Sequence, residues 1–209
     1  MNYLYRIVNA LLAAVVFPII LLMDFIYFRI GTTLVDAGLH ETLSVKDMID
    51  IVRGDHYYSY IFDGIKSSSF SWPEAFDVIN GRLITSGVCL ALVVVIAIFI
   101  IVWSICSNKR IPVAAASGLG LVSTIIMSAC FKSAASVITT GVIGIKDIMS
   151  TGILTSILGS VIKIEAISLA GFQNGLIFLF IFLLIWTGCY YIIEIGEDKD
   201  GKVKADKKK

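Results

Sequence analysis

The sequence predicts an all-α membrane protein with four transmembrane helices, and three observations support this fold class. Hydrophobic residues make up 57% and charged residues 16% of the 209 residues, whereas roughly a quarter of residues are charged in soluble proteins. Apolar stretches long enough to cross a bilayer as helices recur along the chain. Glycine and hydroxyl side chains also recur at helical spacing, as in membrane helices that pack closely. We therefore expect a multi-pass protein of the cell membrane, with the lipid bilayer as its first partner.

The first segment, residues 1–30, contains a short N-terminal stretch and the first predicted span. Residues 7–30 are apolar except for Asn9, Asp24 and Arg29, and the run is too long for the core of a signal peptide. Asp24 is the acid placed well inside this predicted span, so it is a candidate intramembrane charge. Its position near the outer end, close to Arg29, favours a structural or interfacial role over an ion pathway.

Residues 31–82 are predicted to form an acidic, aromatic outer loop between the first and second spans. Ser44 followed by Asp47 suggests a short helix start, and residues 71–74 give a clearer one, with the spacing of a capping box and proline in the first turn. An Asp-Gly pair at residues 63–64 also favours a small hairpin. Rigid aromatic side chains suit a partner-binding surface, with a small loop core or contact with lipid headgroups as the alternatives. The candidate partner-binding residues are Tyr57, Tyr58, Tyr60, Phe62 and Trp72.

The second and third spans are predicted at residues 83–107 and 113–132, and a short basic turn separates them. Small residues recur at every fourth position of the third span, which places them on one helix face. They are Ala116, Gly120, Thr124 and Ser128. We expect this face to pack against a neighbouring helix, and the alternative is that it lines a water-filled path.

Residues 133–171 are predicted to form an amphipathic or re-entrant helical segment. Its two apolar parts are each too short to span, and Lys146 and Asp147 separate them. This interruption favours helices on the membrane surface, with a re-entrant pair or a further span as alternatives. Small residues continue here as candidates for helix packing or for lining a pore. They are Ser136, Thr140, Gly152, Ser156 and Ser160.

The fourth span is predicted at residues 172–195, followed by a charged cytoplasmic tail without stable structure at residues 196–209. With four spans, Arg6, the turn containing Lys109 and Arg110, and the lysine-rich tail all lie on one side of the membrane. Cytoplasmic flanks of membrane helices are rich in lysine and arginine. We therefore expect both termini in the cytoplasm.

The sequence offers few groups for catalysis or metal binding. His40 and His56 both lie in the outer loop and lack the spacing of a zinc site. Neither a nucleophile elbow nor a phosphate-binding glycine loop is found in the sequence. We therefore expect no enzymatic activity, no catalytic residue, no metal, no cofactor and no nucleic-acid partner.

The plan of four spans, cytoplasmic termini and a longer first outer loop resembles that of claudin-like and connexin-like proteins. The resemblance is one of topology, because the outer loop contains no cysteine and lacks the claudin Gly-Leu-Trp motif. The sequence favours a non-enzymatic subunit that acts through helix packing and partner binding. It would work as a homo-oligomer or with other membrane subunits in an envelope or secretion-type complex. A channel or transporter for small solutes or ions is the alternative, and a membrane-embedded enzyme ranks third.

Overall fold

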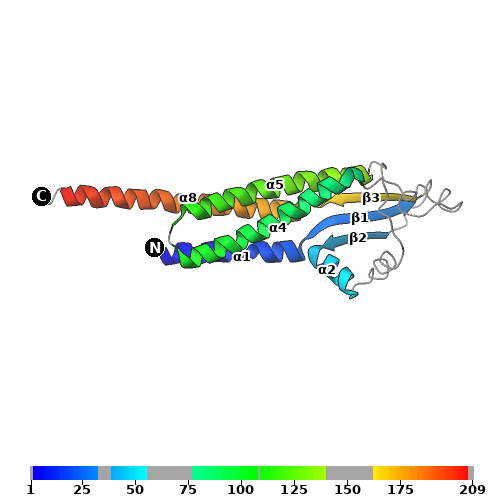
Figure 1. Ribbon diagram of the computed structural model, residues 1–209, viewed down its shortest axis with the longest axis horizontal. Helices are drawn as coiled ribbons and strands as arrows, with labels where there is room; N and C mark the ends of the chain where they lie inside the picture. Colours follow the sequence, from blue (N-terminus) through cyan, green and yellow to red (C-terminus); the bar gives the residue numbers. More distant parts are fainter. Residues whose placement is uncertain (1, 33–38, 56–76, 108, 140–161, 207–209) are drawn as a thin grey trace.

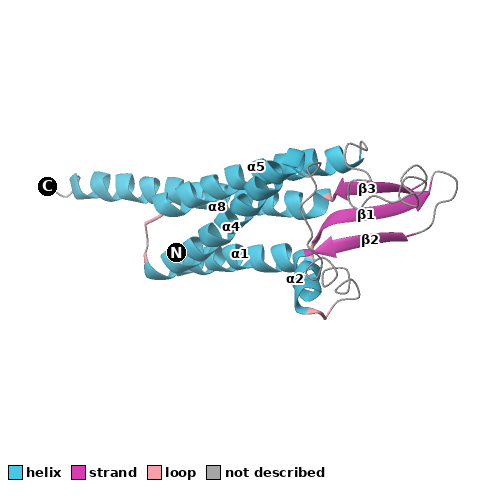
Figure 2. Cartoon of the chain, turned by 45° about the vertical axis from the view of Figure 1, so that its right-hand side comes forward, coloured by secondary structure: helices cyan, strands magenta, loops and turns pink. Residues whose placement is uncertain are grey.

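The computed structural model describes residues 2–32, 39–55, 77–107, 109–139 and 162–206 (Figure 1). Within these described residues, four helices are long and apolar enough to cross a membrane, as expected for a multi-pass membrane protein. They are α1 (Asn2–Leu22), α4 (Asp77–Cys106), α5 (Ile111–Thr139) and α8 (Ala170–Asp206). The first residues of α1 and the last residues of α8 lie at one end of the helices, and three strands lie at the other (Figures 1 and 2).

The four long helices form a closed ring of contacts. Helix α5 packs on both α4 and α8, and α1 packs on both α4 and α8. The interior of this bundle is filled by large apolar side chains, among them Phe180, Ile100 and Leu183, none of which is accessible to solvent. Close packing of this kind holds membrane helices together, because lipid tails are as apolar as the side chains themselves.

The first helix is shorter than the sequence predicts. Helix α1 ends at Leu22, and strand β1 (Asp24–Thr32) begins after Met23. The prediction of one span through residue 30 was therefore wrong in its last part. Residues 24–32 are rich in aromatic and β-branched side chains, which favour a strand. A continuous apolar run does not distinguish a buried strand from the end of a helix.

A three-stranded antiparallel sheet corrects the prediction of a wholly α-helical chain. The strand order is β2-β1-β3, with β2 at Leu39–Ser44 and β3 at Ile162–Ser168. Central strand β1 pairs with β2 through Tyr27 and Thr42, and with β3 through Tyr27 and Ile167. The connections that follow α1 and α5 therefore join in a single sheet.

The predicted helical segment at residues 133–171 is also corrected by this sheet. Its first residues continue α5 as far as Thr139, and residues 162–168 form β3. The Ile-Lys-Ile-Glu sequence that opens β3 alternates apolar and charged residues, which is the period of a strand. The part of the segment at residues 140–161 lies outside the described residues.

The charged tail continues the last helix rather than lacking structure. Helix α8 extends to Asp206, well beyond the apolar residues of its span. Asp198 precedes Lys202 by four residues, and Asp200 precedes Lys204 by the same interval. In the sequence, an acid four residues before a base favours a helix over a chain without stable structure.

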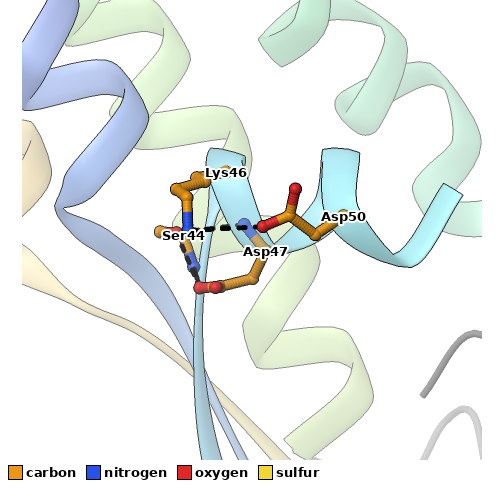
Figure 3. Close-up of polar contacts among 4 residues, drawn as sticks. All are labelled: Ser44, Lys46, Asp47 and Asp50. Carbon is orange, nitrogen blue, oxygen red and sulfur yellow. Dashed lines mark hydrogen bonds and ion pairs between the residues drawn. The ribbon is translucent and has the colours of Figure 1, made fainter. Parts of the chain in front are cut away.

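The helix start predicted at Ser44 is confirmed, and it links the sheet to α2 (Val45–Arg53). The Ser44 hydroxyl accepts a hydrogen bond from the Asp47 backbone N–H at 3.2 Å, and the Ser44 backbone N–H donates to the Asp47 carboxylate at 2.8 Å (Figure 3). Lys46 and Asp50 form an ion pair at 3.4 Å. Gly54 ends the helix with φ of +89°, a conformation that glycine adopts without strain.

Candidate functional site

The small-residue face of α5, formed by Ala116, Gly120, Thr124 and Ser128, is buried inside the molecule. A Cβ atom added to Gly120 would lie 2.4 Å from Cε1 of Phe180 on α8. The aromatic ring therefore occupies the space that a side chain at position 120 would need. The Thr124 hydroxyl donates to the Gly120 carbonyl oxygen at 2.8 Å, so its polar hydrogen is used within α5.

A buried glutamine joins this face to α8 and to the sheet. Gln173 is only 1% exposed. Its Oε1 accepts a hydrogen bond from the Ser128 hydroxyl at 2.6 Å, and its Nε2 donates to the Ser168 hydroxyl at 2.6 Å. Both ends of the amide are thereby satisfied, as is the case for most buried polar groups. Gln173 therefore connects α5, α8 and β3 at the end of the bundle that carries the sheet.

The last turn of α5 covers the outer edge of β3. The Thr139 hydroxyl donates to the Ala166 carbonyl oxygen at 2.7 Å and accepts from the Ala166 backbone N–H at 3.2 Å. Ala135 and Ala166 pack together with Ile26 of β1 beneath this contact. An uncovered strand edge invites pairing with another chain, and a covering helix prevents it. Here the helix makes the sheet a fixed extension of the bundle.

The opposite end of the bundle holds a cluster of arginine and aromatic side chains. Arg110, only 8% exposed, donates to the Tyr190 carbonyl oxygen and lies over the rings of Tyr5 and Tyr190, at 5.1 and 5.6 Å from their centroids. Arg6 donates through Nε to the Ser104 carbonyl oxygen at 2.8 Å. Cation–π contacts gain strength where water is excluded. These contacts tie the ends of all four helices together.

Three buried polar side chains lie close to this cluster in the bundle. Asn9, Ser104 and Thr187 are at most 1% exposed, and no hydrogen-bond partner for their side chains is found among the described residues. They come from α1, α4 and α8. Helices α1 and α8 are antiparallel, and Tyr5 of α1 contacts Tyr190 of α8. Asn9 lies about one turn after Tyr5 and Thr187 about one turn before Tyr190, so the two residues lie at a similar height in the bundle. Asn9 was visible in the sequence as a polar residue in an apolar run, but its buried neighbours were not.

Comparisons with protein-family models, curated proteins and solved structures gave no match to this chain.

The structure places the remaining candidate residues apart from the buried face of α5. Asp24 is half-buried and opens β1, so it does not lie within a helical span, which corrects that expectation. Ser136 is exposed, and its hydroxyl donates to the Ser133 carbonyl oxygen at 2.8 Å. Within the described part of the chain no three metal-binding side chains come together. The candidates outside the described residues are Thr140, Gly152, Ser156, Ser160, Tyr57, Tyr58, Tyr60, Phe62 and Trp72.

Proposed function

We propose that this protein is a non-enzymatic membrane subunit that works by binding partners, either further copies of itself or other membrane subunits. The observation that carries this proposal is the packing of the small-residue face of α5 against Phe180 of α8. Because this face packs against a helix of the same chain, the bundle is a compact scaffold for a binding surface rather than a path for solutes or ions. The bilayer of the cell membrane surrounds it, and both termini face the cytoplasm.

The sheet is well suited to present a binding surface because it is held rigidly. Only Met23 separates α1 from β1, and only Leu169 separates β3 from α8. The Leu169 backbone N–H donates to the Phe25 carbonyl oxygen at 3.0 Å, which links the two junctions. Binding groups that stand on rigid elements lose less entropy when a partner binds. The sheet end of the molecule is therefore the best candidate for the outer binding surface.

The aromatic residues of the outer loop would supply most of the binding energy. Their segment leaves the described chain after Asp55, at the end of α2, and returns at Asp77, the start of α4. Helix α2 lies beside the sheet (Figure 2). Tyrosine and tryptophan dominate the energetics of many protein interfaces because they bury large rigid surfaces. We propose that Tyr57, Tyr58, Tyr60, Phe62 and Trp72 contact the partner.

A path for small solutes or ions remains the second candidate, because Asn9, Ser104 and Thr187 leave polar atoms without described partners inside the bundle. Such a path would have to pass Phe180, Leu183 and Ile100, which fill the interior. It therefore requires the helices to separate. A membrane-embedded enzyme ranks third, because no described cluster suggests a reaction.

The test compares the wild-type chain with a variant in which the five aromatic loop residues are replaced by serine. Both are expressed in membranes, crosslinked mildly and sized. The proposal predicts a complex larger than the monomer for the wild type, monomer size for the variant, and the same thermal unfolding for both. Equal sizes for the two chains contradict partner binding by the loop. Ion or solute flux through liposomes containing the wild-type chain favours the second candidate instead.

A further inference from the structure

An apolar cavity of about 190 Å³ lies where the helical bundle meets the sheet. Five of its lining side chains are Phe25 of β1, Leu83 and Leu90 of α4, and Met127 and Phe131 of α5. The rings of Phe25 and Phe131 are in edge contact, with centroids 5.3 Å apart, and they form one wall. Its remaining lining residues include members of α2 and α8, so five elements build the cavity rather than a single loose loop.

The course of α4 explains why a cavity forms at this place. Helix α4 crosses the bundle obliquely, from beside the N-terminal part of α1 to beside the C-terminal part of α5 (Figure 1). Ser104 near its end is bonded to Arg6 of α1. Near its start, Arg82 donates to the Ser133 carbonyl oxygen of α5 at 3.4 Å. On the side where α4 has left α1, Phe25 and Val45 of α2 line the cavity in its place.

The polar atoms that line the cavity are already engaged. The Ser86 hydroxyl donates to the Met127 carbonyl oxygen at 3.4 Å. Gln173 bonds to Ser128 and Ser168 through the two ends of its amide. Because these groups have partners within the protein, the cavity offers little to a polar ligand. Its chemistry suits a hydrocarbon.

The cavity opens on the side of α4 that carries exposed apolar residues. Gly87 lines it, is exposed, and would meet no heavy atom within 4 Å if it carried a Cβ. Ile84 and Val88, 59% and 56% exposed, are near it on the same helix. Gly87 lies ten residues into α4, about 15 Å from its start at a rise of 1.5 Å per residue. With both termini in the cytoplasm, as proposed above, this mouth would face the acyl chains of the outer leaflet.

We propose that the cavity binds the end of a lipid acyl chain that enters laterally beside Gly87. An apolar protein cavity of roughly 150 Å³ accepts a benzene molecule, so by the same scaling this one holds about seven or eight carbon atoms. That is the terminal part of a chain rather than a whole lipid. The bound chain fills the gap between α4, α5 and β1, and so joins the bundle to the sheet. This site does not depend on the partner-binding function proposed above.

The test uses the full chain in nanodiscs of phosphatidylcholine that carries a photoreactive diazirine on the terminal carbon of one acyl chain. Crosslinks are mapped by mass spectrometry. We expect strong labelling of Leu83 to Leu90, and a several-fold loss of it in Gly87→Phe, whose ring closes the mouth. Gly118→Phe is the matched control, because Gly118 also meets no atom within 4 Å and does not line the cavity. Its labelling of Leu83 to Leu90 should equal that of the wild type.

Two results overturn the proposal. The first is labelling of Leu83 to Leu90 that is no stronger than at Ile125, an exposed residue of α5, or that Gly87→Phe leaves unchanged. The second is labelling by a free benzene-sized diazirine probe without labelling by the lipid, which assigns the cavity to a dissolved apolar molecule. Thermal unfolding verifies that each variant is folded. If Gly87→Phe does not fold, Gly87→Leu replaces it, with the same expected direction and the same contradiction.

Discussion

Replacing Gly120 by alanine tests the packing of α5 against α8 at its tightest point. The added Cβ would lie 2.4, 2.6 and 2.8 Å from three atoms of the Phe180 ring. Phe180 is completely buried, and because protein interiors are closely packed its ring can turn aside only by displacing its neighbours. Overpacking of this kind costs about 1–3 kcal/mol. It opposes a gain of about 1 kcal/mol that alanine brings over glycine inside a helix.

The matched control is Gly118→Ala, two residues earlier in the same helix. A Cβ at Gly118 meets no heavy atom within 4 Å, so this variant receives the gain in helix propensity without a clash. The difference between the two variants therefore isolates the clash. At about 2 kcal/mol it corresponds to a difference in Tm of about 4–8 °C for a chain of this size. Thermal unfolding of both variants in the same detergent measures it.

A second substitution identifies the ring as the cause. In the double variant Gly120→Ala/Phe180→Leu, the smaller side chain leaves room for the new methyl group. We expect the double variant to be more stable than the sum of the two single changes predicts, by about 0.5–3 kcal/mol. The reasoning is refuted if Gly120→Ala and Gly118→Ala shift Tm equally, or if the two changes at positions 120 and 180 simply add.

Three further predictions follow from the hydrogen bonds and cation–π contacts. Thr139→Val removes the hydroxyl that bonds both backbone groups of Ala166, so it should lower stability by about 1–3 kcal/mol and speed hydrogen exchange in β3. Ser136→Ala at an exposed site should change neither quantity. Equal exchange in the two variants would contradict the contact between Thr139 and β3. Ser44→Ala breaks the capping box and should cost about 1 kcal/mol, seen as faster exchange in the first turn of α2, while unchanged exchange would argue against the cap. Arg110→Lys loses the planar guanidinium that lies over the rings of Tyr5 and Tyr190 and should lower stability by about 1 kcal/mol. Lys109→Ala at the exposed neighbouring position should have little effect. Equal values of Tm for the two variants would contradict a stabilising role of Arg110.

The long helices were predictable because their signals are local. An unbroken apolar run identifies α4, α5 and most of α8, and Ser44 followed by Asp47 indicates the start of α2. Strand β1 was missed because its apolar residues continue the apolar run of α1. Its partner β3 lies far away in the sequence, so the pairing of Ile26 with Ser168 leaves no local signal.

The candidate site was predictable only in part for the same reason. The four-residue spacing of Gly120 and Thr124 predicts a helix face that packs closely against another helix, but the identity of that helix depends on tertiary structure. Phe180 and Gln173 are unremarkable within the apolar sequence of α8, and only the fold brings them onto that face. The buried position of Arg110 also could not be read from its place in a basic turn.

In the packed bundle the small-residue face of α5 is sealed from water, and the reactivity of a cysteine at position 124 tests this most directly. Thr124 is completely buried. In a chain whose four native cysteines are replaced by alanine, Thr124→Cys should not react with a water-soluble thiol reagent applied from either side of the membrane, while Asp55→Cys at an exposed site should react. Rapid reaction at position 124 would mean that water reaches this face, and it would contradict the packed bundle in favour of a solute path.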